Sequence, residues 1–181
     1  ISTYQSVSGS GHKGLNQLAA EQRGEVSDNP AYPHQIHENV IPHGGSFSDT
    51  GYTAEEEKLM FETNKILHSD IAVTATVVRV PVYGGHSESV NVEFEQQFDI
   101  EEVRNILSNA SGVTLYDNPS ENIYPTPVMA YDKDDVFVGR LRRDFSIEKG
   151  LNFWVVSDNI RKGAATNAVQ IAKYIIENFG I

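Results

Sequence analysis

The sequence predicts an α+β fold built on a mixed, largely antiparallel sheet with helices packed on one face. The first observation behind this prediction is that strand-like and helical segments follow one another without strict alternation, unlike a purely parallel α/β sheet. The second is size, because 181 residues, of which 39% are apolar, suffice for one continuous hydrophobic core. We therefore expect one main domain in residues 1–160, followed by a C-terminal helix in residues 161–181.

Local periodicity and capping signals predict the individual elements. A glycine-rich turn at residues 9–14 separates the first strand from the first helix, and residues 24–52 are typical of a loop. Thr53 and Glu56 form a capping box that starts the second helix, and Asp99 caps the third. In chain order we expect a strand at 1–7, helices ending near 22 and at 54–68, strands at 71–82 and 85–96, a helix ending near 109, strands at 113–116, 135–143 and 152–156, and a helix at 161–178.

Composition excludes several classes of function. The formal charge is −11, from 14 basic and 25 acidic residues, and it disfavours binding to nucleic acids or to anionic membrane surfaces. The chain contains no cysteine, which excludes disulfides, zinc–thiolate sites and a cysteine nucleophile supplied by this chain. We find no transmembrane run and no signal peptide, so the cytoplasm is expected. The start at Ile1, inside a strand-like run, indicates a piece of a longer protein.

Three histidines lie in the loop region but do not predict a metal site. The stretch 32–43, which carries His34, His37 and His43, is too apolar and too rich in proline for a simple linker. These histidines do not combine with a nearby acidic residue at a recognised metal-ligand spacing. We therefore expect no metal.

Two strands in the middle of the chain carry the most informative pattern. Residues 71–82 and 85–96 predict a hairpin, and side-chain alternation places Arg79 at the end of one apolar stripe and His86 at the start of another. Both then lie at the turn end of the hairpin. A guanidinium at the edge of a core suits a carboxylate, and an imidazole moves protons near neutral pH. The alternative is that Arg79 pairs with a structural carboxylate and His86 is an ordinary strand-end residue.

Three further patterns are ambiguous without other information. Glu55, Lys58 and Glu62 share one helix face, which is ordinarily a solvated charge ladder. Residues 9–14 match G-x-G-x-x-G, but the second apolar strand and acidic residue of a dinucleotide fold do not follow, so we reject a complete Rossmann domain. The turn is either plain or contacts a phosphate or ribose bound elsewhere. Arg161 and Lys162 open the last helix against the dipole preference, and a bound anion would relieve this conflict.

The apolar residues of the last helix recur at helical spacing over four turns. So wide a stripe must be buried, either against this chain's own sheet or against a domain that the chain lacks. Its members are Ala165, Ala168, Val169, Ala172, Ile175, Ile176 and Phe179.

Taken together, these motifs carry a family resemblance. The segments that carry it are Ser2-Thr3-Tyr4-Gln5-Ser6-Val7-Ser8-Gly9-Ser10-Gly11, Pro33-His34-Gln35, Asn39-Val40-Ile41-Pro42-His43, Glu55-Glu56-Glu57-Lys58, Arg79-Val80-Pro81-Val82, Gly85-His86, and Asp158-Asn159-Ile160-Arg161-Lys162-Gly163-Ala164-Ala165. The chain resembles the C-terminal catalytic and dimerisation domain of the aspartate-semialdehyde dehydrogenase family, whose fold is similar to the C-terminal domain of glyceraldehyde-phosphate dehydrogenase. In that family an N-terminal Rossmann domain binds NADP and supplies the catalytic cysteine, and neither is present in this chain.

The resemblance implies a reaction and a set of site residues. The reaction is the reversible reductive dephosphorylation of aspartyl phosphate to aspartate semialdehyde and phosphate, in lysine, threonine and methionine biosynthesis. His86 matches the general acid/base that assists the cysteine. The other matches are Arg79 for the substrate carboxylate, Glu55 for the substrate ammonium group, Lys58 for the phosphate, Gln5 near the thioester, and Ser8, Gly9, Asn159, Lys162 and Gly163 for NADP.

The resemblance also implies partners. A homodimer and a missing N-terminal NADP-binding domain are expected, and the helix in residues 161–181 should pack on that domain. Because the chain lacks the nucleophile, it should be inactive alone. The alternatives are a non-catalytic dimerisation or binding module, and the related acyl-phosphate reductase of arginine biosynthesis, which the Arg79–His86 spacing and the Glu55/Lys58 pair fit poorly.

Overall fold

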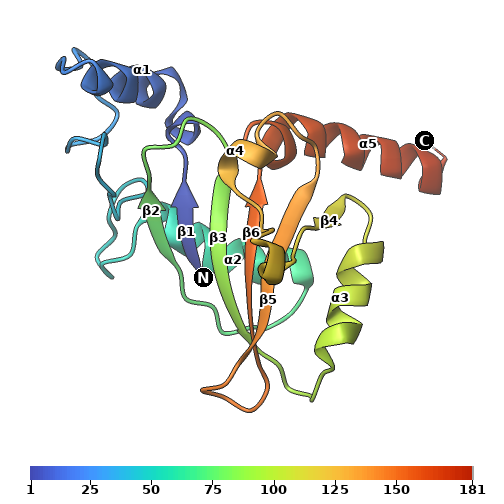
Figure 1. The fold of residues 1–181 in the computed structure, drawn as a ribbon. Coiled ribbons are helices and arrows are strands. Elements are labelled where there is room, and N and C mark those ends of the chain that lie inside the picture. Colours follow the sequence, from blue (N-terminus) through green and yellow to red (C-terminus); the bar gives the residue numbers. More distant parts are fainter. Residues whose placement is uncertain (181) are drawn as a thin grey trace. The chain divides into compact units, whose positions relative to one another are not determined.

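The computed structural model describes residues 1–180 (Figure 1), which form two compact units. One unit comprises Ile1–Tyr83 with Glu88–Val90, and the other comprises Gly84–Ser87 with the chain from Asn91 onward. Strand β3, His86–Glu93, gives residues to both. In the first unit the strand order is β2 (Thr76–Arg79), β1 (Ser2–Gln5) and β3. In the second it is β3, β6 (Gly150–Ser157), β5 (Val136–Asp144) and β4 (Val113–Leu115). Parallel and antiparallel pairs both occur, so the predicted α+β fold with a mixed sheet is confirmed.

The first unit is built on a parallel strand pair. Strand β1, Ser2–Gln5, pairs with β2, Thr76–Arg79, in a register that places Gln5 opposite Arg79. The predicted alternation holds on β2, because Val77 and Arg79 are buried whereas Thr76 is exposed. A 3₁₀ turn, Val7–Ser10, leads into α1, Gly11–Gln22, and the predicted capping box starts α2, Ala54–Leu67. The core of this unit consists of Val7, Leu18, Tyr32, Ile36 and Ile41.

The predicted hairpin between residues 71–82 and 85–96 is wrong. Strand β2 is short and pairs in parallel with β1, which lies between β2 and β3 in the strand order. The physical reason lies in the connection after Arg79. Its backbone is held by the end of β1, since Val80 donates to the carbonyl of Gln5 and Val82 accepts from Val7, both at 2.9 Å. This connection crosses a strand and does not form the tight two-residue turn that closes a hairpin.

The second unit contains the remaining strands, two helices that lie between them in the chain, and the C-terminal helix. The predicted Asp99 cap is present, because its carboxylate accepts from the Glu101 N–H at 2.7 Å. The core consists of Ala130, Phe137 and Val156. Figure 1 shows α3 beside β4. The elements are α3, Ile100–Asn109, β4, Val113–Leu115, a 3₁₀ turn, Pro119–Glu121, α4, Pro127–Ala130, β5, Val136–Asp144, and β6, Gly150–Ser157.

Strand β5 contains a bulge that is held by a buried ion pair. The register against β6 shifts between Gly139 and Arg142, and Arg140 there has a φ of +57°. The Asp117 carboxylate accepts from the N–H groups of Arg140 and Leu141, at 2.7 and 3.2 Å. Arg104 reaches the same carboxylate from α3 at 2.8 Å. The pair therefore fixes a backbone irregularity that would otherwise leave amide groups without partners.

The C-terminal helix leaves its apolar stripe exposed. A π-helical turn, Arg161–Ala165, continues into α5, Thr166–Phe179, and no described residue of α5 is buried. Val169 and Phe179 are 68% and 69% exposed. Figure 1 shows α5 running away from the strands of its own unit. The stripe therefore does not pack into this chain's own core. Residue 181, the last of the predicted helical segment 161–181, lies outside the described residues.

Candidate functional site

Arg79 is a buried cation at the end of β2. The residue is 8% exposed, and its Nη1 donates to the carbonyl of Ser6 at 3.1 Å. Its Nε is buried without a hydrogen-bond partner, and no carboxylate in residues 1–180 forms an ion pair with it. Burial lowers the pKa of the guanidinium, and the nearby Tyr32 and Glu55 offset this only in part. A buried charge of this kind calls for an anion that the described chain does not supply.

Three other residues predicted for the site gather near Arg79. Gln5 lies opposite Arg79 in the β1–β2 register and is 7% exposed. Immediately after it, the chain turns so that the Gly9 N–H donates to the Ser6 carbonyl at 3.2 Å, while the Ser6 and Ser8 hydroxyls lie 2.9 Å apart. The carbonyl of Ser6 thus accepts hydrogen bonds from both the Arg79 guanidinium and the Gly9 N–H. The structure brings Gln5, Ser8 and Gly9 together with Arg79.

The start of α2 shows why Glu55 differs from its acidic neighbours. Glu56 is buried, and its carboxylate accepts from the N–H groups of Thr53 and Val77 at 2.7 and 2.9 Å. Burial opposes its ionisation, but these hydrogen bonds outweigh it and lower its pKa. Glu57 accepts from the Ser48 hydroxyl at 2.6 Å. Both are therefore committed to the local fold.

Within residues 1–180, by contrast, Glu55 forms an ion pair with Lys58 alone, at 3.7 Å and one helical turn away. The negative charge of Glu55 partly offsets the lowering of the Arg79 pKa by burial. Glu55 therefore lies within electrostatic reach of that guanidinium. This arrangement supports the choice of Glu55 among the three acids. Glu62, which shares the predicted face, forms no ion pair among the described residues.

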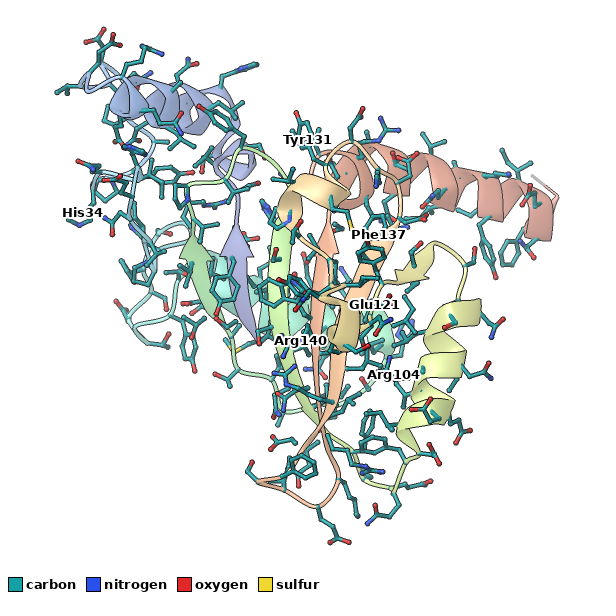
Figure 2. All side chains as sticks on the ribbon, viewed as in Figure 1. His34, Arg104, Glu121, Tyr131, Phe137 and Arg140 are labelled. Carbon is teal, nitrogen blue, oxygen red and sulfur yellow. The ribbon has the colours of Figure 1, made fainter. Side chains whose placement is uncertain are left out.

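His86 opens β3, and its backbone approach is tightly constrained within the second unit. Gly85 has a φ of +84°, and a Cβ there would lie 2.9 Å from the carbonyl oxygen of Pro127. A Cβ on Gly84 would overlap the ring of Tyr131 (Figure 2). The Gly85 N–H donates to Oδ1 of Asn159 at 3.1 Å. The structure therefore brings Asn159, one of the predicted cofactor residues, to the residue before His86.

The segment that precedes α5 is organised by carboxylates of this chain. Asp158 is 3% exposed and accepts from the N–H groups of Ile160, Arg161 and Asp132. Arg161 pairs with Asp132 and Asp134 at 2.9 and 2.8 Å, and its guanidinium hydrogen bonds lower the pKa of Asp134 to about 2. The expected conflict between Arg161 and the helix dipole is thus relieved from within the chain.

Lys162 and Gly163 lie on the same segment. The Lys162 ammonium donates to Oε1 of Gln170 at 2.7 Å, and Gly163 donates to the Asp158 carbonyl at 3.1 Å. Gly163 is exposed, and a Cβ there would meet nothing closer than 3.8 Å. The backbone at Gly163 is therefore open to solvent. The predicted site residues thus fall into two sets, one in each unit.

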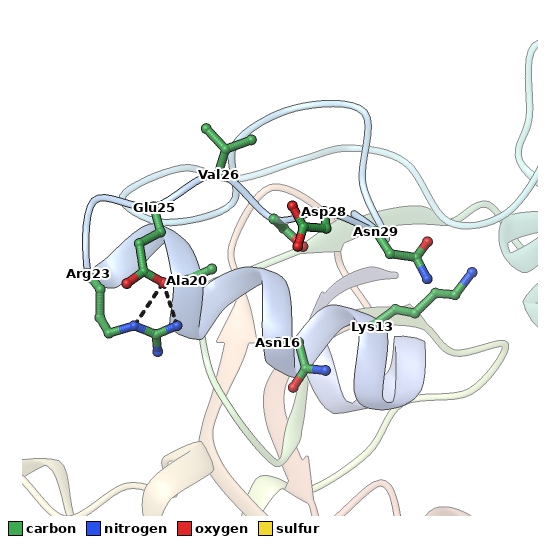
Figure 3. A pocket seen from close by; sticks show the side chains of 9 residues that line it. Lys13, Asn16, Ala20, Arg23, Glu25, Val26, Asp28 and Asn29 are labelled. Carbon is green, nitrogen blue, oxygen red and sulfur yellow. Dashed lines mark hydrogen bonds and ion pairs between the residues drawn. The ribbon is translucent and has the colours of Figure 1, made fainter.

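The glycine-rich turn borders a cavity that does not include the predicted residues Ser8 and Gly9. The cavity has a volume of about 320 Å³ and lies between α1 and the loop after it (Figure 3). Arg23 and Glu25 on its rim pair at 2.7 Å. A Cβ on Gly14 would overlap the carbonyl of Val7, so this glycine is needed for close packing of the turn. The lining residues are Lys13, Asn16, Ala20, Arg23, Glu25, Val26, Ser27, Asp28 and Asn29.

Two features of the site had no signal in the sequence. The Asn159–Gly85 hydrogen bond joins residues 74 positions apart, and the ring of Tyr32 lies beside Arg79 although the loop around it has no periodic pattern. In residues 1–180 no three His, Cys, Asp or Glu side chains are grouped as they would be around a metal ion. No helix in the same range is both long and apolar enough to cross a membrane.

Comparisons with known proteins agree on one family. The family described as "Semialdehyde dehydrogenase, dimerisation domain" matches residues 1–162. The aspartate-semialdehyde dehydrogenase of Aquifex aeolicus is 50% identical, over 98% of this chain and 54% of that protein. The enzyme of the same name from Legionella pneumophila is 49% identical, over 99% of this chain and 53% of that protein. The chain thus spans about half the length of these curated relatives.

A solved structure extends the likeness to three dimensions. The crystal structure described as aspartate semialdehyde dehydrogenase II from Vibrio cholerae, complexed with ASA, superimposes with a TM-score of 0.91 at 44% identity. The match covers 98% of this chain and 54% of that one.

Proposed function

Because the chain belongs to the semialdehyde dehydrogenase dimerisation-domain family, we propose that it is the substrate-binding, C-terminal part of an NADP-dependent aspartate-semialdehyde dehydrogenase. The parent enzyme would convert aspartyl phosphate into aspartate semialdehyde and phosphate by reductive dephosphorylation. The chain has no cysteine, so the nucleophile that forms the acyl-enzyme must come from the other half. The isolated chain should therefore be inactive.

The observation that carries this proposal is the buried guanidinium of Arg79. An arginine is costly to bury without an anion, yet its Nε has no partner and no described carboxylate forms an ion pair with it. The planar fork of a guanidinium matches a carboxylate in a bidentate manner. The substrate carboxylate would supply that anion.

Other residues of the first unit would then bind the remaining groups of the substrate. Glu55 would accept the substrate ammonium group, since its carboxylate is not committed to the α2 cap. Lys58, whose side chain is 54% exposed, would bind the phosphate that leaves. Gln5, opposite Arg79 on the neighbouring strand, would lie near the thioester.

His86 would move the protons of the reaction. It would first take the proton of the cysteine thiol in the other half, and the thiolate would attack the acyl carbon so that phosphate leaves. After reduction of the thioester it would hydrogen-bond to the oxyanion of the tetrahedral adduct, and as the adduct collapses to the aldehyde it would return the proton to the departing sulfur. The reduced form of the cofactor, NADPH, would supply the hydride when bound. The residues that would hold the cofactor are Ser8, Gly9, Asn159, Lys162 and Gly163.

The test is His86→Ala in the full-length enzyme. Loss of general acid/base assistance should lower kcat on the order of 10²–10⁴-fold with little change in KM, because the interaction develops during proton transfer. His34→Ala is the matched control, since His34 is exposed in the other unit (Figure 2), and it should retain normal turnover. Near-normal turnover of His86→Ala would remove His86 from the mechanism.

We propose the same division of the chain that the sequence predicts, with residues 1–160 as the catalytic domain and 161–181 as a helix that packs on the missing NADP-binding domain. The exposed stripe of α5 supports this, because solvent exposure forfeits about 1.5–3 kcal/mol per large apolar side chain relative to burial. Amide exchange of this chain should show α5 less protected than β5 and β6. Equal protection in a monomeric sample would contradict the proposal.

We also propose that the chain forms a homodimer and works in the cytoplasm, without nucleic-acid or membrane partners. The description of the matching family as a dimerisation domain supports the first part, and isologous contacts between copies of this domain do not require the other half. Sedimentation at micromolar concentration should give a dimeric mass. A monomeric mass would count against it.

A further inference from the structure

One irregular segment of the first unit donates backbone hydrogen bonds to side chains of α1. We call residues 31–41 the belt. Oε1 of the buried Gln17 accepts from the N–H groups of Ala31 and Tyr32, at 2.8 and 2.9 Å. One turn later on α1, Oε2 of Glu21 accepts from the N–H groups of Ile36 and His37, both at 2.8 Å. Side chains of α1 thus replace the backbone partners that a sheet would provide.

The belt ends on Arg79. The N–H of Ile41 donates to the Arg79 carbonyl at 2.9 Å, and the Arg79 N–H donates to the Ile41 carbonyl at 2.8 Å. The belt also places Tyr32 against the arginine, with the guanidinium carbon 6.0 Å from the ring centroid. The Tyr32 hydroxyl donates to Oγ of Ser10 at 2.9 Å. The backbone, ring and hydroxyl of Tyr32 are therefore each fixed by a different partner.

These contacts restrict the directions in which Arg79 can bind an anion. The Nη1 atom is taken by the Ser6 carbonyl, and the Tyr32 ring lies to one side of the guanidinium. The Nε remains without a partner. Two-point recognition of a carboxylate requires the plane of the fork to be fixed, and an orientation fixed in advance reduces the cost of binding. The Ser6 carbonyl holds one end of the fork, and the Tyr32 ring lies beside it.

We propose that Tyr32 is a positioning residue for Arg79, and that Gln17 holds the belt so that the Tyr32 ring orients the guanidinium toward the substrate carboxylate. This inference rests on the proposed function and adds a determinant of specificity to it. Tyr32 touches Arg79 and acts on the substrate only through it. Burial raises the pKa of the phenol, so the hydroxyl remains a donor to Ser10 throughout the neutral range.

The test compares Tyr32→Leu, Tyr32→Phe and Gln17→Met in the full-length enzyme, assayed in the oxidative direction. Tyr32→Leu removes the ring and should raise the KM for aspartate semialdehyde about tenfold, with kcat within about threefold, because a misaligned clamp weakens binding. The KM for phosphate should not change. Tyr32→Phe keeps the ring, so its KM for aspartate semialdehyde should stay within about threefold of the wild-type value. Gln17→Met should raise the same KM as Tyr32→Leu does.

The matched control is Tyr83→Leu. Tyr83 also bonds α1, through its hydroxyl and Oε1 of Gln22 at 2.6 Å, but it is 45% exposed. We expect this variant to retain both KM values. If Tyr32→Leu leaves the KM for aspartate semialdehyde unchanged, or raises the KM for phosphate equally, the proposal is overturned.

A double variant covers the case in which Tyr32→Leu does not fold. In an Arg79→Lys background, Gln17→Met should have no further effect on the KM for aspartate semialdehyde, because Gln17 acts through the guanidinium. Additive effects would overturn the proposal. The proposed function and the positioning role fail in different ways. If Arg79→Lys alone leaves the KM for aspartate semialdehyde unchanged, the proposed function fails. If Arg79→Lys raises that KM and Gln17→Met does not, only the positioning role fails.

Discussion

Arg104 and Arg79 are both largely buried arginines, one in each unit, and they differ in what neutralises them. Arg104 reaches Asp117, whose side chain is fully buried, at 2.8 Å. In the described part of the chain the Arg79 guanidinium donates to the Ser6 carbonyl and faces no carboxylate partner, and its Nε has no hydrogen bond. The same side chain thus completes an internal ion pair in one unit and remains uncompensated in the other.

This difference separates a structural arginine from a binding arginine more sharply than burial does. Breaking an internal pair leaves a buried charge alone, so the fold depends on both partners. An arginine without an internal partner contributes little to folding, and its energetic requirement is met only when a ligand arrives. We therefore expect variants at Arg104 and Asp117 to act on stability, and variants at Arg79 to act on substrate binding.

The largest expected effect is on the Asp117 side of this comparison. Asp117→Ala should lower the free energy of unfolding by roughly 3–5 kcal/mol, because it leaves Arg104 with the exposed Glu101 at 3.7 Å in place of a buried partner at 2.8 Å, and because it removes the acceptor for the Arg140 N–H in the bulge. Asp117→Asn keeps an acceptor oxygen and should cost less. Denaturant unfolding measures both. If Asp117→Ala were as stable as the wild type, the ion pair would not be structural.

Arg79→Lys should have the next largest effect. It should act on substrate binding and not on the stability of the fold. The KM for the amino-acid substrate of the full-length enzyme should rise on the order of 10–100-fold, because a point charge replaces a bidentate fork. The free energy of unfolding should stay close to that of the wild type. Steady-state kinetics and unfolding of the same preparation provide the test. A change confined to the KM for NADP would refute the carboxylate-binding role.

The smallest effect belongs to a third arginine, Arg161, whose side chain is 41% exposed. Its hydrogen bonds lower the pKa of Asp134 to about 2, below the usual value near 3.9. A depressed folded-state pKa means that the pair contributes stability above about pH 4 and loses it as the pH falls toward 2. The difference in melting temperature between the wild type and Asp134→Asn should therefore shrink over that range. A difference independent of pH would show that the charge of Asp134 is irrelevant.

Local signals in the sequence predicted the parts of the fold that depend on neighbouring residues. The Asp99 cap, the box of Thr53 and Glu56, and the alternation that buries Val77 and Arg79 are all present. Each depends on residues within a few positions of one another. By contrast, the hairpin prediction failed because alternation identifies a strand and its faces but not its partner, and β1 competes for the position beside β2.

The parts of the site that escaped prediction depend on contacts over long distances in the chain. Gln17 bonds the belt 14 and 15 residues away, and Asn159 bonds Gly85 across 74. A glutamine in a helix or an asparagine before one has many ordinary uses, so neither residue type carries a signal by itself. The distinction between Glu55 and Glu56 likewise required the hydrogen bonds of Glu56 to be known.

The two glycines before His86 also limit which mutations of the gene the protein can tolerate. Any base change that alters a glycine codon to another amino acid adds a Cβ, and at Gly84 that atom would collide with Tyr131. At Gly85 it would meet both a left-handed φ of +84° and the Pro127 carbonyl. Gly24, with a φ of +75° and nothing within 4 Å, faces only the first of these obstacles. Random mutagenesis should therefore recover substitutions at Gly24 long before it recovers any at Gly84 or Gly85.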